Sequence, residues 1–322
     1  MSDAPLITTS HGTRPEAFGP TEWLLLASIA LMWGSSFLFI AVGLDAFAPG
    51  LITPMRIAFG AACLGLVGAR RGSIDRRDWS RIVILAFCWM AFPLSLFPFA
   101  QQWIDSSLAG MLNGAMPLTT ALIAAILLRQ VPGRWQVVGL VVGFGGVLLI
   151  SLPSLDGASS TALGVAMILV AVVFYSLSVN IAVPLQQRYG ALPVMFRAQL
   201  VALAMTLPLG LASVPSSSFA WDSLAAVAAL GVLGTGLAFI AMGTLIGRAG
   251  ATRGAVAIYF VPVVAIVAGV VFRDEVVGVP ALLGTALVMG GAWLTSRQEA
   301  QARASSPAGA EPDLRPGLDT AT

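Results

Sequence analysis

Long apolar blocks, separated by short stretches with charges or turn residues, occupy most of the chain between residues 22 and 296. Each block is close to the roughly 20 residues that an α-helix needs to cross a lipid bilayer. The pattern predicts an all-α integral membrane protein with ten transmembrane helices, over residues 22–43, 50–69, 82–100, 107–128, 134–152, 162–184, 192–213, 222–247, 252–272 and 277–296.

The composition excludes a soluble protein. Hydrophobic residues make up 57% of the chain and charged residues 10%, whereas an ordinary soluble domain is about a quarter charged. So little polar surface could not cover a core of this size in water. The polar ends, residues 1–21 and 297–322, read as disordered tails, and the first of them lacks the pattern of a signal peptide.

The arginines, which supply all 17 basic residues, are distributed unevenly around the predicted spans. Short cytoplasmic loops of membrane proteins are enriched in positive charge. With a cytoplasmic N-terminus, fourteen arginines fall on the cytoplasmic side and Arg273 alone in the loops opposite. We therefore expect a multi-pass protein of the bacterial inner membrane with both termini in the cytoplasm. Spread between apolar blocks, the arginines form no patch for nucleic acid.

One pattern occurs twice, 145 residues apart. The second copy has the same spacings as the first, and the paired positions are Pro117/Pro262, Gln130/Glu275, Gly139/Gly284, Gly145/Gly290 and Gly146/Gly291. The repeat predicts two related halves, residues 22–152 and 162–296. Each half has five spans, an odd number, so the second half must enter the membrane upside down. Inverted-topology repeats of this kind are typical of secondary transporters.

The earlier parts of the halves align at an offset of 141 residues, which pairs Arg56 with Arg197 and Trp33 with Phe174. The segments WGSSF at 33–37 and MRIAFGAA at 55–62, together with the repeated proline–glycine pattern, resemble the ten-helix EamA-type family of the drug/metabolite transporter superfamily. The resemblance implies a carrier of small metabolites whose spans 1–4 and 6–9 surround a central cavity, with spans 5 and 10 outside. The family often has Glu where this chain has Gln130.

Polar and aromatic residues inside the spans are candidates for binding a substrate in that cavity. Asn113, Pro117 and Thr120 share one helix face, and Tyr259 is one position from the repeat counterpart of Asn113. The competing interpretation for each candidate is packing between helices, where polar groups often form hydrogen bonds. The candidates are Trp33, Ser36, Arg56, Trp89, Asn113, Tyr175, Asn180 and Tyr259.

Three charged residues have opposing interpretations. Arg56 and Arg197 lie five or six residues inside their spans, where arginine is costly unless it is paired or extends to the interface. We expect Arg56 to face the cavity and Arg197 to be an anchor. Glu275 is expected near the external interface, where it would either be solvated or stabilise the start of a helix predicted from Val276.

The mid-span prolines and the glycines predict features of packing and movement. Pro117 and Pro262 each remove a backbone hydrogen bond and should kink their helices. Glycines let helices approach closely, and Gly139 with Gly143 forms a GxxxG pattern on span 5. That pattern suggests a homodimer contact through span 5.

The sequence predicts an alternating-access carrier that moves a small metabolite, an amino acid or a related amphipathic organic solute, across the inner membrane. The resemblance favours export over import. We expect no cofactor, no metal and no catalytic residues. Two other classes remain open, an integral-membrane enzyme and a helical scaffold subunit without transport activity. The chain lacks HExxH and GxSxG motifs, and a scaffold would leave the inverted repeat unexplained.

Overall fold

The computed structural model describes residues 19–68, 72–127, 132–155, 159–249 and 256–304. In these residues every regular element is a helix, and nine helical stretches are long and apolar enough to cross a membrane. The apolar helix Val279–Thr295 supplies a tenth, shorter stretch. The predicted all-α fold of ten transmembrane helices is therefore confirmed.

The first half contributes five spans, two of which consist of several helical pieces. In order along the chain they are α1 (Pro20–Leu44); α2 (Pro49–Leu66); η1 (Arg76–Asp78), α3 (Trp79–Leu85), η2 (Ala86–Ala91) and α4 (Phe92–Ala100); α5 (Ser106–Asn113) and α6 (Met116–Leu127); and α7 (Arg134–Leu155).

The second half repeats this plan. Its spans are α8 (Ser159–Tyr189); α9 (Ala191–Ser213) with the turn η3 (Val214–Ser216); α10 (Trp221–Ala229), η4 (Leu230–Leu237) and α11 (Ala238–Ala249); α13 (Val256–Tyr259) and α14 (Val261–Arg273); and α15 (Val279–Ala304).

Interruptions occur in matching spans of the two halves. The third span contains a π-helical segment, η2, and its counterpart in the second half contains another, η4. The fourth span breaks between α5 and α6, which begins one residue before Pro117, and the ninth breaks between α13 and α14, which begins one residue before Pro262. Each proline occupies the first turn of the second piece, where its missing N–H costs nothing. The sequence predicted kinks at both prolines, and the helix is interrupted beside each of them.

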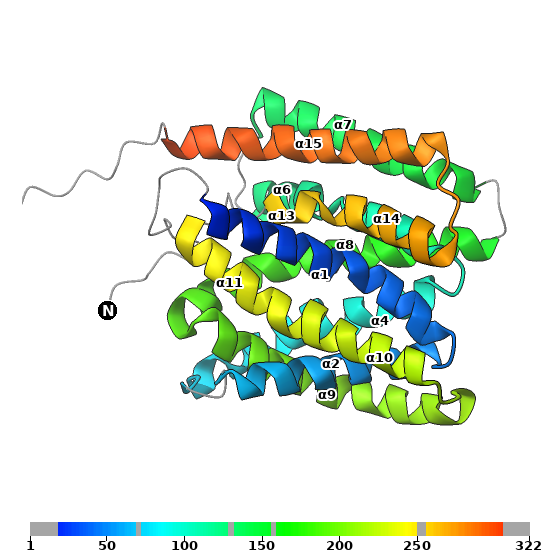
Figure 1. Ribbon diagram of the computed structural model, residues 1–322. Coiled ribbons are helices and arrows are strands. Elements are labelled where there is room, and N and C mark those ends of the chain that lie inside the picture. Colours follow the sequence, from blue (N-terminus) through cyan, green and yellow to red (C-terminus); the bar gives the residue numbers. More distant parts are fainter. Residues whose placement is uncertain (1–18, 69–71, 128–131, 156–158, 250–255, 305–322) are drawn as a thin grey trace, which may run out of the picture.

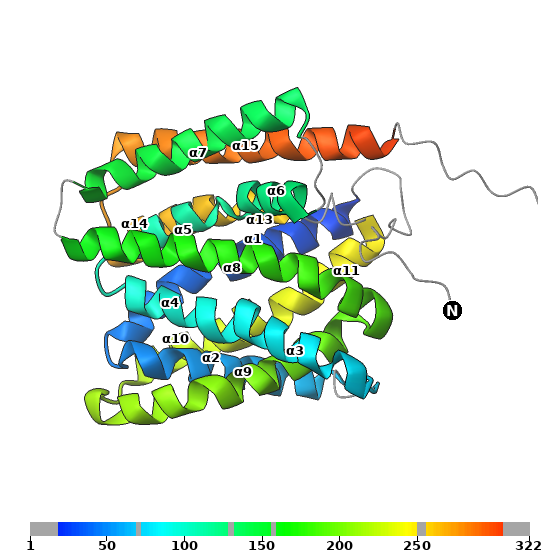
Figure 2. The same cartoon turned by 180° about the vertical axis from the view of Figure 1, so that it is seen from behind.

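The two halves run in opposite directions. In Figure 1, α1 passes from left to right, whereas α8, the first helix of the second half, returns from right to left. Figure 2 shows the reverse side, where α8 runs beside α4 of the first half.

The packing of α7 against α15 carries the symmetry of the repeat. A Cβ atom on Gly139 would lie 2.6 Å from the carbonyl oxygen of Gly291, and one on Gly146 would lie 2.5 Å from that of Gly284. Gly291 and Gly284 are the repeat counterparts of Gly146 and Gly139. Gly139 therefore contacts the counterpart of Gly146, and Gly146 contacts the counterpart of Gly139. Reciprocal contacts of this kind are the signature of a two-fold axis.

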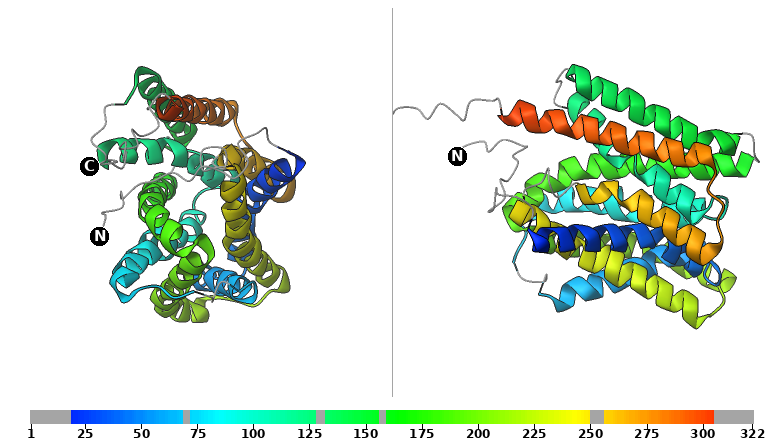
Figure 3. Two further views of the ribbon diagram at one scale, coloured as in Figure 1. Left: turned by 90° about the vertical axis from the view of Figure 1, so that its left-hand side faces the viewer. Right: turned by 45° about the horizontal axis from the view of Figure 1, so that its top comes forward.

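The helices α7 and α15 lie together on one side of the bundle, as the resemblance implied for spans 5 and 10 (Figure 3). The glycine face of α7 is buried within the chain, because a Cβ on Gly139 would meet α15 and one on Gly143 would meet Leu118. The GxxxG pattern therefore forms an internal contact, and this face is not open to a second copy. Val141 and Leu148 on the outer face are 67% and 66% exposed, as expected for side chains against lipid.

Two predicted boundaries are wrong. Helix α1 begins at Pro20, inside the predicted tail 1–21, and α15 continues to Ala304, past the tail boundary at 297. Proline is favoured in a first helical turn. The sequence after Thr295 is rich in Ala, Arg, Gln and Glu, which have high helix propensity, so the helix continues beyond the apolar block.

Ion pairs between the halves lie at both ends of the bundle. At the end that holds the start of α1, Arg248 Nε lies 2.7 Å from Glu22 Oε1. At the opposite end Arg273 forms a two-pronged pair with Asp45, at 2.7 and 3.0 Å. Both pairs join a residue of one half to a residue of the other, so they hold the halves in register across the bundle.

Glu275 stabilises a helix start, but in the first half rather than at span 10. Helix α15 begins at Val279, and the Glu275 carboxylate instead accepts hydrogen bonds at the start of α5, from the backbone N–H groups of Ser106 (2.9 Å) and Ser107 (2.8 Å) and from the Ser106 hydroxyl (2.6 Å). Because this cap crosses between repeats, local sequence could not indicate it. Gln130, the repeat counterpart, lies outside the described residues.

This cap should make the stability of the protein sensitive to acid. Burial alone would raise the pKa of Glu275, but the hydrogen bonds from Ser106 and Ser107 outweigh it and lower the pKa below its ordinary value of 4.5. The stabilisation that the ionised Glu275 cap gives the folded protein is therefore complete above about pH 4.5, and it is lost as the pH falls through the folded-state pKa. We expect Glu275→Gln to lower the free energy of unfolding by roughly 1 kcal/mol at pH 7, because the group is partly exposed.

Thermal unfolding in detergent at pH 7 and at pH 4 tests this prediction, with Asp222→Asn as the control. Asp222 is another acid in the first turn of a helix, α10, and its side chain is exposed. An equal loss of stability in both variants at pH 7 would contradict the assigned role of Glu275.

Candidate functional site

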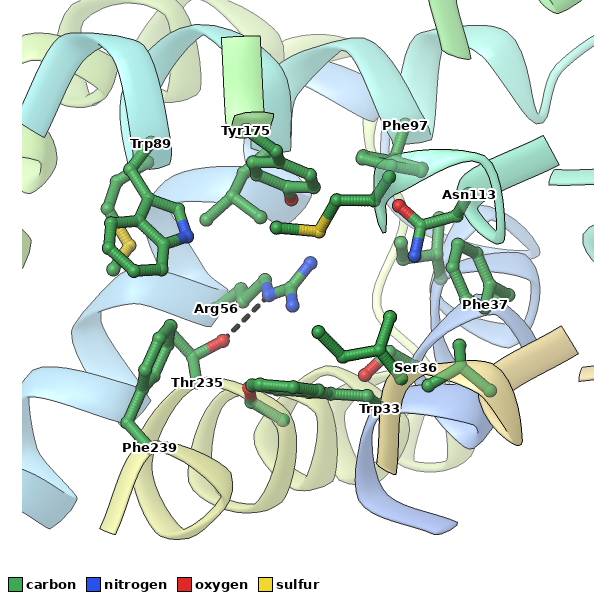
Figure 4. A pocket seen from close by; sticks show the side chains of 17 residues that line it. Trp33, Ser36, Phe37, Arg56, Trp89, Phe97, Asn113, Tyr175, Thr235 and Phe239 are labelled. Atoms are coloured by element: carbon green, nitrogen blue, oxygen red, sulfur yellow. Dashed lines mark hydrogen bonds between the residues drawn. The ribbon is translucent and has the colours of Figure 1, made fainter. Parts of the chain in front are cut away.

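A cavity of about 100 Å³ lies at the junction of the two halves (Figure 4). Spans 1 to 4 line it from the first half, and spans 6, 8 and 9 from the second. The lining residues are mostly aromatic and aliphatic: Trp33, Ser36, Phe37, Ile40, Arg56, Trp89, Met90, Leu94, Phe97, Asn113, Met116, Tyr175, Gly234, Thr235, Phe239, Ile258 and Val261. Span 7, α9, supplies no residue to this lining but supports it from behind.

The structure brings most of the candidate residues predicted from sequence together here. Those that line the cavity are Trp33, Ser36, Arg56, Trp89, Asn113 and Tyr175. Asn180 and Tyr259 are not in the lining. The Asn180 amide donates to the carbonyl of Ser176 one turn earlier (3.0 Å), and the Tyr259 hydroxyl donates to the carbonyl of Ala292 on α15 (3.2 Å).

Arg56 is the charged side chain of the cavity. It is buried, with 8% of its surface exposed, and its Nε donates a 2.7 Å hydrogen bond to the hydroxyl of Thr235. No carboxylate of the described residues lies within salt-bridge distance of it. Its repeat counterpart Arg197 has the anchoring role expected of it, because it donates to the carbonyls of Pro193 and Gly72 at the end of the bundle.

A buried chain of hydrogen bonds holds Arg56 in place. Gln199 on α9 donates from Nε2 to the carbonyl of Thr235 (2.7 Å), and the Thr235 hydroxyl accepts from Arg56. Gln199 and Thr235 are almost completely buried, at 0% and 1% exposure. Three spans, α2, η4 and α9, therefore fix one guanidinium group, and its two terminal nitrogens are left to face the cavity (Figure 4).

The π-helical segment η4 also anchors an aromatic side chain. The indole Nε1 of Trp33 donates to the carbonyl of Gly234 (3.1 Å), which lies in η4. A Cβ on Gly234 would lie 2.5 Å from the hydroxyl oxygen of Ser36, so a larger residue there would displace the Ser36 side chain. π-Helical segments of this kind are frequent at functional sites.

Aromatic rings form two walls of the cavity. Phe239 packs edge-to-face against Trp33 and against Trp89, with ring centroids 6.0 and 5.7 Å apart. Across the cavity, Phe97 and Tyr175 stack at 5.8 Å. These contacts are in the range favoured by aromatic pairs, so both walls are apolar and are held by contacts between rings.

Asn113 is the last residue of α5, and the break in the fourth span places its amide at the cavity (Figure 4). Its side-chain oxygen is buried and has no hydrogen-bond partner among the residues that the structure describes. Leaving a buried acceptor unpaired costs about 1–3 kcal/mol. The carbonyl is therefore available to a donor from a bound molecule.

Sequence reasoning missed Thr235, Phe239 and Ile258, although the repeat contained signals for two of them. Ile258 is the repeat counterpart of Asn113 at an offset of 145 residues, and Thr235 is that of Leu94 at an offset of 141. Both members of each pair line the cavity. Applying the symmetry strictly would have indicated Ile258 in place of its neighbour Tyr259. Nothing in the sequence indicates Phe239 or the supporting Gln199.

Ten apolar helices in two opposed halves, with a cavity between the halves, define a helical membrane protein of the two-repeat transporter class. The chain belongs to the EamA-like transporter family: the sequence model of that family matches residues 21–152 and again residues 162–297. It is accordingly a multi-pass membrane transporter and not an enzyme.

Relatives of known name agree with this assignment. An uncharacterized transporter of Archaeoglobus fulgidus is 21% identical over 86% of this chain and 99% of its own length. A probable terminal-alkyne amino-acid exporter of Streptantibioticus cattleyicolor is 28% identical, over 86% of this chain and 93% of its own. A solved crystal structure with 20% identity matches with a TM-score of 0.62, over 87% of this chain and 99% of that chain, which supports the fold alone.

Proposed function

We propose that the protein is a secondary carrier that binds a small organic solute in the cavity and exposes it to the two sides of the membrane in turn. The observation that carries this proposal is the position of the cavity. It is built from both halves, next to the breaks in spans 4 and 9 and the π-helical segments of spans 3 and 8. Relative movement of the halves would therefore open it to either side.

The solute we propose is an amino acid or a related amphipathic organic molecule, and the direction is export from the cytoplasm. A relative is named as a probable amino-acid exporter, and the cavity combines polar groups with aromatic walls. The uneven distribution of arginines supports an inner-membrane location with cytoplasmic termini. We favour a carrier over a scaffold subunit, which would have no use for a cavity with polar groups between its halves.

Transport by the purified protein in liposomes tests the proposal. We expect saturable movement of labelled amphipathic amino acids, lowered at least about tenfold by Asn113→Ala, since the variant removes a buried polar contact to the solute. Asn180→Ala is the matched control, because Asn180 lies outside the cavity lining, and its flux should stay near that of the wild type. Absence of flux across a broad panel of metabolites would refute the carrier function.

A further inference from the structure

The cavity has a net positive charge. Arg56 is the one charged side chain among the lining residues, and arginine stays protonated in proteins. Only its Nε is engaged in a hydrogen bond within the described part of the chain. The two terminal nitrogens, which carry the donors suited to bind a carboxylate in a fork, point into the cavity (Figure 4).

A buried cation without a counter-charge is costly in a low-dielectric environment. The acids that form ion pairs or caps cannot supply that counter-charge, because they are used at the ends of the bundle. Glu22 pairs with Arg248, Asp45 with Arg273, and Asp78 with Arg188. Glu275 caps α5. No carboxylate of the described residues lines the cavity, so the negative charge is left for the solute to supply.

The remaining polar groups restrict the solute further. The unpaired Asn113 oxygen needs a hydrogen-bond donor. The Tyr175 hydroxyl also points into the cavity (Figure 4) and adds a donor for an anion. Among the described residues, the lining has no carboxylate that could pair with an ammonium group, and a zwitterion would leave the charge of the cavity at plus one.

We infer that the solute is an organic monocarboxylate with an apolar or aromatic body, recognised through its carboxylate by Arg56 and through a neutral donor, such as a hydroxyl, by Asn113. An ammonium group is not required. This inference rests on the proposed function and sharpens it: 2-hydroxy acids and simple carboxylic acids are bound at least as well as the amino acids of the same shape.

Four probes of nearly equal size separate these features: 4-methylpentanoate, 4-methylpentanamide, 2-hydroxy-4-methylpentanoate and leucine. Their binding to the full-length protein in detergent is measured by isothermal titration calorimetry, and the corresponding phenyl compounds test the size of the body. We expect the carboxylate to bind at least about tenfold more tightly than its neutral amide, as for a hydrogen bond to a charged group. The affinity for the hydroxy acid should equal or exceed the affinity for leucine.

Variants of the two repeat-related arginines locate the effect. Arg56→Gln should lower the affinity for the carboxylate by about ten- to a hundredfold and leave that for the amide within about threefold. Arg56→Lys keeps the charge but lacks the forked donors, so its affinity for the carboxylate should lie between those of the wild type and of Arg56→Gln. Arg197→Gln is the matched control, because Arg197 binds backbone carbonyls outside the cavity, and its carboxylate affinity should match that of the wild type. Size-exclusion chromatography shows which variants are folded, and the comparison of probes on the wild type needs no variant.

Three results would overturn the inference. Equal affinities for the acid and its amide would show that the charge of the carboxylate is not recognised. Preference for leucine over the hydroxy acid by more than about tenfold would show that the ammonium group is recognised. Liposomes that carry other solutes but none of the acids would exclude monocarboxylates and leave the carrier function intact. Liposomes that carry no solute at all would refute the proposed function itself.

Discussion

Alanine at Gly146 is expected to destabilise the protein by about 1–3 kcal/mol, whereas alanine at the adjacent Gly145 is expected to be neutral or slightly stabilising. A Cβ on Gly146 would lie 2.5 Å from the carbonyl oxygen of Gly284 and 2.7 Å from the backbone nitrogen of Val288. Backbone atoms of α15 cannot rotate away, so the helices α7 and α15 would have to separate. A Cβ on Gly145 meets nothing within 4 Å.

The repeat provides a second, independent pair for the same experiment. A Cβ on Gly291 would meet the backbone of Gly139 and Gly143, whereas one on Gly290 meets nothing within 4 Å. Gly291→Ala should therefore behave like Gly146→Ala, and Gly290→Ala like Gly145→Ala. Thermal unfolding of the four variants in one detergent measures the difference. Equal midpoints for Gly145→Ala and Gly146→Ala would show that α7 and α15 do not pack through this face.

Much of the fold could be predicted because the bilayer imposes lengths that are visible in the sequence. Ten apolar blocks of about the right length predict ten helices, and the repeated proline–glycine pattern predicts how the halves are related. The partner of a glycine face was not predictable in the same way. Gly139 and Gly143 fit a dimer contact and an internal contact equally well, and the antiparallel α15 decided between them.

The site was predictable where a residue was unusual in its own segment. Arginine inside an apolar span is rare, and so is an asparagine in the middle of one, which made Arg56 and Asn113 stand out. Thr235 and Gln199 did not stand out, because threonine and glutamine near a span have many ordinary roles. Their function comes from contacts between spans that lie far apart in the chain, such as the 2.7 Å bond between Arg56 and Thr235.

The misplaced role of Glu275 has the same physical origin. The sequence correctly indicated a carboxylate at the positive end of a helix, but the helix nearest in the chain was the wrong one. The Glu275 carboxylate instead accepts hydrogen bonds at the start of α5, where Ser106 lies 169 residues earlier in the chain. Inverted repeats bring the ends of distant spans together at one face of the membrane. A cap between the halves is therefore expected in this architecture. Contacts between the two halves are the ones that local sequence does not indicate.

If Thr235 positions Arg56, then Thr235→Val should weaken carboxylate binding by about tenfold while preserving the shape of the cavity. Valine keeps the volume but removes the hydroxyl, so the buried Arg56 Nε loses its 2.7 Å partner and the guanidinium is free to turn away from its binding orientation. Thr235→Ser retains the hydroxyl and should restore most of the affinity. That rescue separates an effect of the hydrogen bond from an effect of lost packing.

Thr206→Val on α9 is the matched control, because its hydroxyl is also buried but, within the described residues, bonds only to carbonyls of its own helix, Ala202 at 2.9 Å and Leu203 at 3.3 Å. Titration with 4-methylpentanoate and 4-methylpentanamide measures all three variants. We expect Thr235→Val to lose affinity for the acid and to keep its affinity for the amide, since the amide does not depend on the orientation of a charged fork. Parallel losses for both probes would mean that Thr235 only maintains the packing between η4 and α2. Arg56 would then bind the solute without help from the second half.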